Sequence, residues 1–186
     1  MDAPPSPDVV QKALRKALAA IEGSGFKGVA FGGVARVAWG SKLPIAVAEL
    51  LLTSGEAQRE TIRGAVRGEG LQQIQDAGPL SFRYTDAKLG GSTPVELLES
   101  STPLHKQILS RVQPGAYHQL SMSVPTCEDT ILLLAASPVP ADREGVIELL
   151  RGHAGRIDAA YIKQQGEANG IFDKVKSAWQ EAKQRG

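Results

Sequence analysis

The feature that most constrains the fold is an almost entirely apolar segment, IAVAELLLT, at residues 45–53. A run of branched and apolar residues is typical of a central β-strand that is covered on both faces. Such a strand needs packed layers on either side of its sheet, so the segment favours an α/β architecture. One carboxylate, Glu49, lies within the segment, and this acid is the first candidate for a functional residue.

Helix and strand patterns alternate on both sides of this segment. Ser6 as an N-cap, Pro7 at the first helical position and a single apolar stripe predict a helix over residues 6–25. A short strand at 26–31 then leads into Gly32-Gly33. The other elements expected in this part are a short helix at 34–39, a helix at 54–68, strands at 80–86 and 93–99, a helix at 102–112 and one closing strand at 116–125.

The pattern changes from a period of two to a helical period near Val124. Four helical segments follow, with short breaks between them, at 127–136, 142–153, 156–168 and 170–185. We therefore expect an α/β domain over residues 1–123 and a C-terminal helical subdomain over residues 124–186 that packs on it. The expected fold class is α/β (α+β), a mixed sheet of about four or five strands flanked by helices.

Composition and charge exclude several classes of protein. The chain has 21 basic and 20 acidic residues, a net charge of +1, so no strong field attracts nucleic acid or an anionic membrane. A single cysteine, Cys127, excludes an intramolecular disulfide. No apolar run approaches the length of a membrane span. We expect a cytoplasmic protein that does not associate with membranes.

The order of elements around Gly32-Gly33 resembles that of the polymerase-beta-type nucleotidyltransferase superfamily. The signature of this family is a hydrophobic residue before Gly-Gly or Gly-Ser, a spacer, and then Asp-x-Asp or Asp-x-Glu on a strand. In this chain Phe31-Gly32-Gly33 precedes Val47-Ala48-Glu49. The resemblance implies a nucleotidyltransferase-like mixed sheet flanked by helices, with a helical C-terminal part.

Later segments extend the resemblance over nearly the whole chain. Residues 92–112, STPVELLESSTPLHKQILSRV, are similar to the segment in which the family places its third carboxylate, here Glu96. Residues 124–162 are similar to the helical region of the bacterial branch related to antitoxins and abortive infection. Asp142 and Tyr161 are among the residues that match this region without a gap.

The resemblance also implies a chemistry and the residues for it. Enzymes of this family transfer a nucleoside monophosphate with two Mg²⁺ ions held by carboxylates. Glu49 corresponds to the second acid of the metal site and Glu96 to the third, whereas Val47 occupies the first position and cannot bind a metal ion. The residues that correspond to the phosphate-binding positions are Gly32, Gly33, Ser41 and Lys42.

Four further positions that are polar in the family are apolar in this chain. Leu43 and Ile45 replace an arginine and a threonine, Leu134 replaces a lysine and Val139 replaces an arginine. Apolar side chains around a triphosphate leave its charge uncompensated, which is costly. We therefore interpret the chain as a degenerate, catalytically inactive member of this fold, with no metal and no cofactor, that acts by binding a protein partner.

Two alternatives remain open at this point. An active enzyme would use Mg²⁺, a nucleoside triphosphate, Glu49, Glu96 and a third acid such as Glu56 or Asp86. It would modify an RNA or protein acceptor in a toxin–antitoxin or phage-defence setting, and only then would nucleic acid be a partner. The other alternative is a sensor that binds a nucleotide without a metal. Val47 discriminates between these hypotheses, because activity requires a substitute acid within reach of Glu49.

Several candidates also have a purely structural interpretation. Glu49 could end a buried strand and reach solvent or Arg36, and Gly32-Gly33 could serve a tight turn. The acids that follow Cys127 are expected to raise the pKa of its thiol, which argues against a nucleophilic role. The three histidines, His105, His118 and His153, have no metal-ligand spacing.

Overall fold

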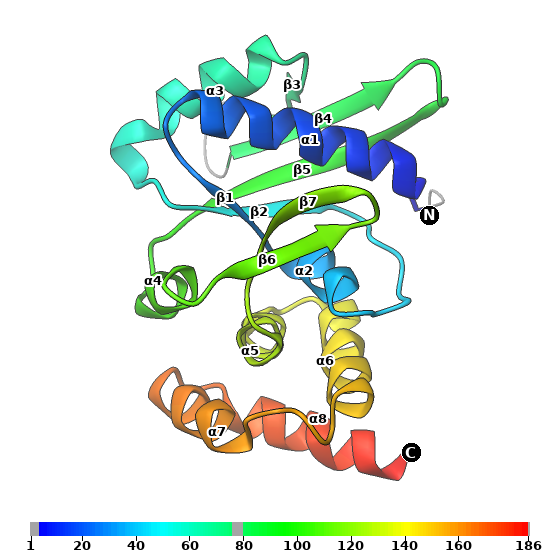
Figure 1. Ribbon diagram of the computed structural model, residues 1–186, viewed down its shortest axis with the longest axis vertical. Coiled ribbons are helices and arrows are strands. Elements are labelled where there is room, and N and C mark those ends of the chain that lie inside the picture. Colours follow the sequence, from blue (N-terminus) through cyan, green and yellow to red (C-terminus); the bar gives the residue numbers. More distant parts are fainter. Residues whose placement is uncertain (1–3, 76–79, 186) are drawn as a thin grey trace.

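The computed structural model describes residues 4–75 and 80–185 and contains a mixed sheet with the strand order β3-β4-β5-β2-β1-β7-β6 (Figure 1). The strands are β1 (Gly28–Ala30), β2 (Ala48–Leu52), β3 (Gln72–Gln73), β4 (Leu80–Asp86), β5 (Gly91–Glu99), β6 (Gln113–Tyr117) and β7 (Leu120–Val124). The helices are α1 (Pro7–Gly23), α2 (Gly32–Ala38), α3 (Arg59–Gly68), α4 (Pro103–Leu109), α5 (Cys127–Ala136), α6 (Pro140–Gly152), α7 (Ala159–Ala168) and α8 (Phe172–Gln184), and a 3-10 turn, Glu56–Gln58, precedes α3. The expected mixed sheet flanked by helices is confirmed.

Helix α1 begins where the sequence predicts. The Ser6 side chain accepts a hydrogen bond from the Val9 amide, and Pro7 occupies the first turn, where a missing N–H group costs nothing. The apolar stripe of α1 packs with the inner side chains of the sheet in one hydrophobic cluster. Figure 1 shows α1 and α3 (blue and cyan) beside the upper strands, and α5–α8 (yellow to red) at the other end of the molecule.

Strand β2 lies in the middle of the sheet, antiparallel to β1 and parallel to β5. Its side chains are buried on both faces, as the apolar segment predicts. The strand is shorter than predicted, however, because it begins at Ala48 and not at Ile45. The Arg36 guanidinium donates hydrogen bonds to the carbonyls of Leu43 (3.2 Å) and Pro44 (3.1 Å), so the backbone just before β2 is tied to α2 and not to the sheet.

The predicted closing strand at 116–125 is wrong, because this region forms part of a hairpin. Strands β6 and β7 are antiparallel and turn at His118, whose φ of 50° is unusual for a residue with a side chain. Strand β7 then runs parallel to β1. With this hairpin and the two-residue β3, the sheet has seven strands and not the four or five expected.

The helices after Val124 build a second hydrophobic cluster around α5. Helix α4 contributes Leu104 and Ile108 to this cluster, and Phe31 and Trp39 pack against it. The Trp39 indole N–H also donates to the Pro125 carbonyl (3.0 Å). Within the described ranges no helix is both long enough and apolar enough to cross a membrane.

Candidate functional site

Glu49 and Glu96 lie side by side on parallel neighbouring strands. They are direct register partners between β2 and β5. On β2, Ala48 and Leu50 point into the cluster under α1, so the alternation of a strand directs Glu49 to the opposite face. The two acids therefore lie on one face of the sheet, as their places in the two strand segments suggest.

A cleft of about 430 Å³ opens on this face, where the sheet meets α4 and the C-terminal helices. Glu49 and Gly32 line it, and Glu96 does not. The other residues that line it are mostly apolar: Phe31, Leu98, Thr102, Leu104, His105, Leu133, Leu134, Ala136, Ser137, Pro138, Val139, Asp142, Asn169 and Ile171. The cleft thus contains one of the two predicted acids beside the glycine pair.

The Glu49 carboxylate lies against the N-terminus of α2, where the predicted glycine turn is the first turn of the helix. Its Oε2 atom accepts a hydrogen bond from the Gly33 amide (3.2 Å). Gly32 has a φ of +50°, and a Cβ atom at this position would overlap the carboxylate. A glycine is required at position 32 both for the backbone conformation and for this close approach.

Burial raises the pKa of Glu49 to about 7. The Gly33 hydrogen bond and the nearby Arg36 oppose this shift, whereas the charges of Asp142 and Glu96 add to it. An acid with a pKa near neutrality is a feature of functional sites.

Ser41 and Lys42 lie elsewhere. The Ser41 hydroxyl is buried and donates to Glu148 of α6, and it accepts a hydrogen bond from Arg36 (2.6 Å). The Lys42 amide donates to the same carboxylate (3.0 Å), while its side chain is exposed. Ser41 lines a different cavity from Gly32, so the structure does not bring the predicted phosphate-binding residues together in one cleft.

The Ser41 hydroxyl joins the buried Arg36 to the half-buried Glu148, and the sequence did not reveal this connection. Arg36 is only 3% exposed, and burial lowers its pKa. A Cβ atom at Gly145 would overlap the Arg36 side chain, so this glycine lets α6 approach α2. The charge of Arg36 acts on Glu49, but the Arg36 side chain donates its hydrogen bonds to Ser41 and to the loop before β2.

The five positions interpreted as degenerate lie in three different places. Leu134 and Val139 line the cleft, and Val139 is 51% exposed at its edge. Ile45 is part of the cluster beneath the sheet. Leu43 and Val47 are half-buried in the loop before β2.

Neither of the substitute acids considered above lies in the cleft. Asp86 is on the face covered by α1, where it accepts hydrogen bonds from Lys12 (2.9 Å) and Tyr84 (2.9 Å) that hold its pKa well below the usual range. Glu56 is exposed in the 3-10 turn after β2. The acid that does line the cleft with Glu49 is Asp142, which was not among the site residues predicted from the sequence.

Two further side chains bear on chemistry. His105 lines the cleft with its ring edge-to-face against Phe31 (centroids 6.0 Å apart), and burial lowers its pKa. The thiol pKa of Cys127 is raised to about 12, as expected, although burial is the main cause and Glu128 a lesser one.

These residues do not fit a two-metal site. Within residues 4–75 and 80–185, no group of three or more His, Cys, Asp or Glu side chains is placed to hold a metal ion. Val47 provides no ligand atom, and Glu49 accepts the Gly33 hydrogen bond. The arrangement can bind a ligand through an apolar wall and two acids.

Comparison with known proteins identifies the fold. No family model and no curated protein sequence matches the chain. The crystal structure of an antigenic nucleotidyltransferase-like protein from Paracoccidioides brasiliensis is similar, with a TM-score of 0.61 over 96% of this chain and 95% of that chain, at 11% sequence identity. Similarity at this level of identity concerns the fold and not the activity. The chain therefore has a nucleotidyltransferase-like fold.

Proposed function

We propose that this protein is a degenerate member of the nucleotidyltransferase fold that transfers no nucleotide and binds a protein partner through the Glu49 cleft. The observation that carries the proposal is the contact between the Glu49 carboxylate and the Gly33 amide. The acid expected to hold a metal and the amide expected to hold a phosphate satisfy one another, and Val47 adds no second ligand.

The charge of the cleft supports this proposal. The described residues that line it include two acids, Glu49 and Asp142, and no lysine or arginine. A triphosphate is a polyanion and needs cations or oriented amides to compensate its charge. This cleft would repel it, whereas a cationic group would be attracted.

The apolar wall indicates what kind of partner fits. Leu104, Leu133 and Ile171 line the interior, and the exposed Val139 extends the apolar surface to the edge. Apolar surface next to a few polar groups is typical of a binding site. The partner expected is a protein segment with apolar side chains and one basic residue that pairs with Glu49 or Asp142. The proposal includes membership of the bacterial antitoxin-related branch, which the resemblance of residues 124–162 supports.

Calorimetry with each ribonucleoside triphosphate and Mg²⁺ or Mn²⁺, together with labelled-nucleotide transfer to RNA and protein, tests the loss of activity. We expect neither micromolar binding nor labelled product. The Val47→Asp variant should gain metal binding if the site descends from a catalytic one. Metal-dependent binding with labelled product would refute the proposal.

Partner binding is tested by replacing Val139 in the full chain. Val139→Lys places a cation at the edge of the cleft and should abolish capture of a partner that the unmodified protein retains. Leu89→Lys is the matched control, because Leu89 is also exposed (43%) and lies outside the cleft. Equal capture by both variants would show that the partner binds elsewhere.

One observation favours a second candidate, an active nucleotidyltransferase of the kind found in toxin–antitoxin or phage-defence systems. Asp142 and Glu96 both raise the pKa of Glu49, so three acids lie near one another electrostatically. Asp142→Asn would abolish transfer in an active enzyme. If the unmodified protein shows no transfer, this candidate is excluded.

A further inference from the structure

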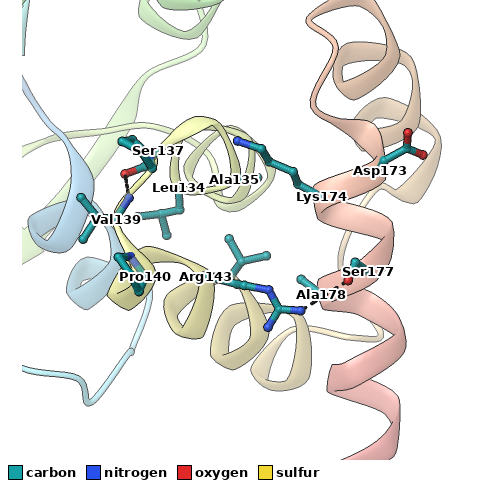
Figure 2. A pocket seen from close by; sticks show the side chains of 12 residues that line it. Leu134, Ala135, Ser137, Val139, Pro140, Arg143, Asp173, Lys174, Ser177 and Ala178 are labelled. Carbon is teal, nitrogen blue, oxygen red and sulfur yellow. Dashed lines mark hydrogen bonds between the residues drawn. The ribbon is translucent and has the colours of Figure 1, made fainter.

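A second cavity, of about 510 Å³, lies in the C-terminal part between the end of α5, the start of α6 and α8 (Figure 2). This volume is in the range usual for small-molecule sites. Its wall is largely apolar, with Leu134, Val139, Val146 and Ala178 among the residues that line it. The cavity lies next to the Glu49 cleft, and Leu134 and the turn at residues 137–139 line both.

Lys174 and Asp173 both line this cavity, but their side chains point in different directions. Figure 2 shows the Lys174 side chain reaching from α8 over the cavity toward Ala135, while the Asp173 carboxylate points away. Within the described ranges the Lys174 side chain has no hydrogen-bond or ion-pair partner. Arg143 differs, because it forms an ion pair with Glu181 (2.5 Å). Lys174 therefore provides a positive charge that remains available to a ligand.

Two hydroxyl groups add hydrogen-bond donors. Ser177 accepts a hydrogen bond from Arg143 (3.3 Å), and Ser137 accepts one from the Val139 amide (3.1 Å, dashed in Figure 2). Each hydroxyl keeps its own proton to donate. The two hydroxyls lie on opposite sides of the cavity in Figure 2, so the anionic head of a ligand is expected at Lys174, and the apolar wall suits an apolar body.

We propose that this cavity binds a small amphipathic carboxylate. The apolar body packs on Leu134, Val146 and Ala178, and the carboxylate pairs with the Lys174 ammonium group. A triphosphate does not suit the cavity, because one available cation cannot compensate several negative charges in apolar surroundings. An amine of the same size would be repelled by Lys174.

Calorimetry on the full chain with octanoate, octanol and octylamine tests this proposal. Octanoate should bind about fivefold more tightly than octanol, and octylamine should bind most weakly. In Lys174→Gln the preference for octanoate should fall to within about twofold. Lys176→Gln, which changes an exposed lysine on the same helix outside the cavity, is the matched control and should keep the preference.

A variant that fills the cavity tests whether the ligand binds there. Ser177 is exposed on α8, so Ser177→Trp is compatible with folding, and it should weaken both octanoate and octanol by about tenfold or more. Circular dichroism checks that each variant is folded. Two results would overturn the proposal: octanoate binding to the unmodified protein no better than octanol or octylamine, or undiminished binding to a folded Ser177→Trp variant.

Discussion

At the scale of single residues, the Glu49 carboxyl group determines the character of the cleft. Its pKa of about 7 makes it partly protonated near neutral pH. The charged form can pair with a cation of a partner, whereas the neutral form can donate a hydrogen bond to a carbonyl. Binding at the cleft should therefore depend on pH in the physiological range.

Glu49 should also make the stability of the protein depend on pH. Its folded-state pKa of about 7 lies above the ordinary value of 4.5, so the folded protein holds the proton more tightly than the unfolded chain does. This stabilisation is complete below about pH 4.5 and is lost as pH rises through about 7. Between pH 5 and pH 8 the free energy of unfolding should fall by about 1–3 kcal/mol more in the native chain than in Glu49→Gln. Urea denaturation of both proteins at the two pH values measures this difference. An equal fall in the free energy of unfolding of the two proteins would contradict the raised pKa of Glu49.

Gly32 gives a second prediction at this scale. Gly32→Ala places a Cβ atom against the Glu49 carboxylate at a φ of +50°, and it should lower the free energy of unfolding by about 2–4 kcal/mol. Gly40→Ala is the matched control, because Gly40 also has a positive φ (+91°) but open space around its Cβ position. The control should lose only about 1–2 kcal/mol. If thermal or urea denaturation gives equal losses, the overlap with Glu49 is not what requires the glycine.

At the scale of elements, α5 is the helix on which the C-terminal part is assembled. Asp129 of α5 is fully buried and accepts hydrogen bonds from Thr126 (2.9 Å), Arg111 (3.2 Å) and Tyr161 (2.5 Å). The Arg111 guanidinium also lies over the Tyr161 ring, 3.9 Å from its centroid. This cluster joins α5 to α7 and to the loop after α4.

The contribution of the Tyr161 hydroxyl to this cluster can be measured by a substitution that removes only that group. Tyr161→Phe leaves a buried carboxylate with one fewer donor and should lower the free energy of unfolding by about 1–3 kcal/mol. Tyr117→Phe is the control, since the Tyr117 side chain is also buried and its hydroxyl forms no hydrogen bond with any described residue. The control should change stability by less than about 0.5 kcal/mol. Equal effects in urea denaturation would show that the Asp129 contact contributes little.

The helices could be predicted from the sequence better than the strands, because the signals that begin a helix lie close together in the chain. Ser6, Thr126 and Asp158 each cap a helix with a side chain that accepts from the first turn, and such signals are read within a few residues. The β6–β7 turn has His118 where hairpins usually have glycine or asparagine, so no local signal marks it. The start of β2 depends on Arg36, a residue outside the strand.

The site was predictable only in part, for the same reason. The pairing of Glu49 with Glu96 follows from strand alternation and the family resemblance. The link from Ser41 to Glu148 joins residues far apart in the chain, and no local pattern indicates it. Asp142 lies in the cleft because α6 packs near α2, which is a property of the tertiary structure.

At the scale of the whole molecule, the two hydrophobic clusters do not divide at the change of pattern near Val124. Leu104 and Ile108 precede this position and belong to the second cluster. Arg36 and Glu148 join the two parts through Ser41 in a buried network. Separating the parts would expose this network and the apolar surface of α4.

We therefore predict that the full chain unfolds in a single cooperative transition. Its two tryptophans allow a test, because Trp39 lies at the end of α2 and Trp179 lies in α8. Trp39→Phe leaves fluorescence from the C-terminal helix alone, and Trp179→Phe leaves fluorescence from the junction, where the Trp39 ring contacts His153 edge-to-face (centroids 5.7 Å apart). In each variant the urea midpoint from fluorescence should coincide with the midpoint from far-ultraviolet circular dichroism, whatever the substitution costs in stability. A fluorescence midpoint that departs from the dichroism midpoint in either variant would show that residues 1–123 and 124–186 unfold as separate units.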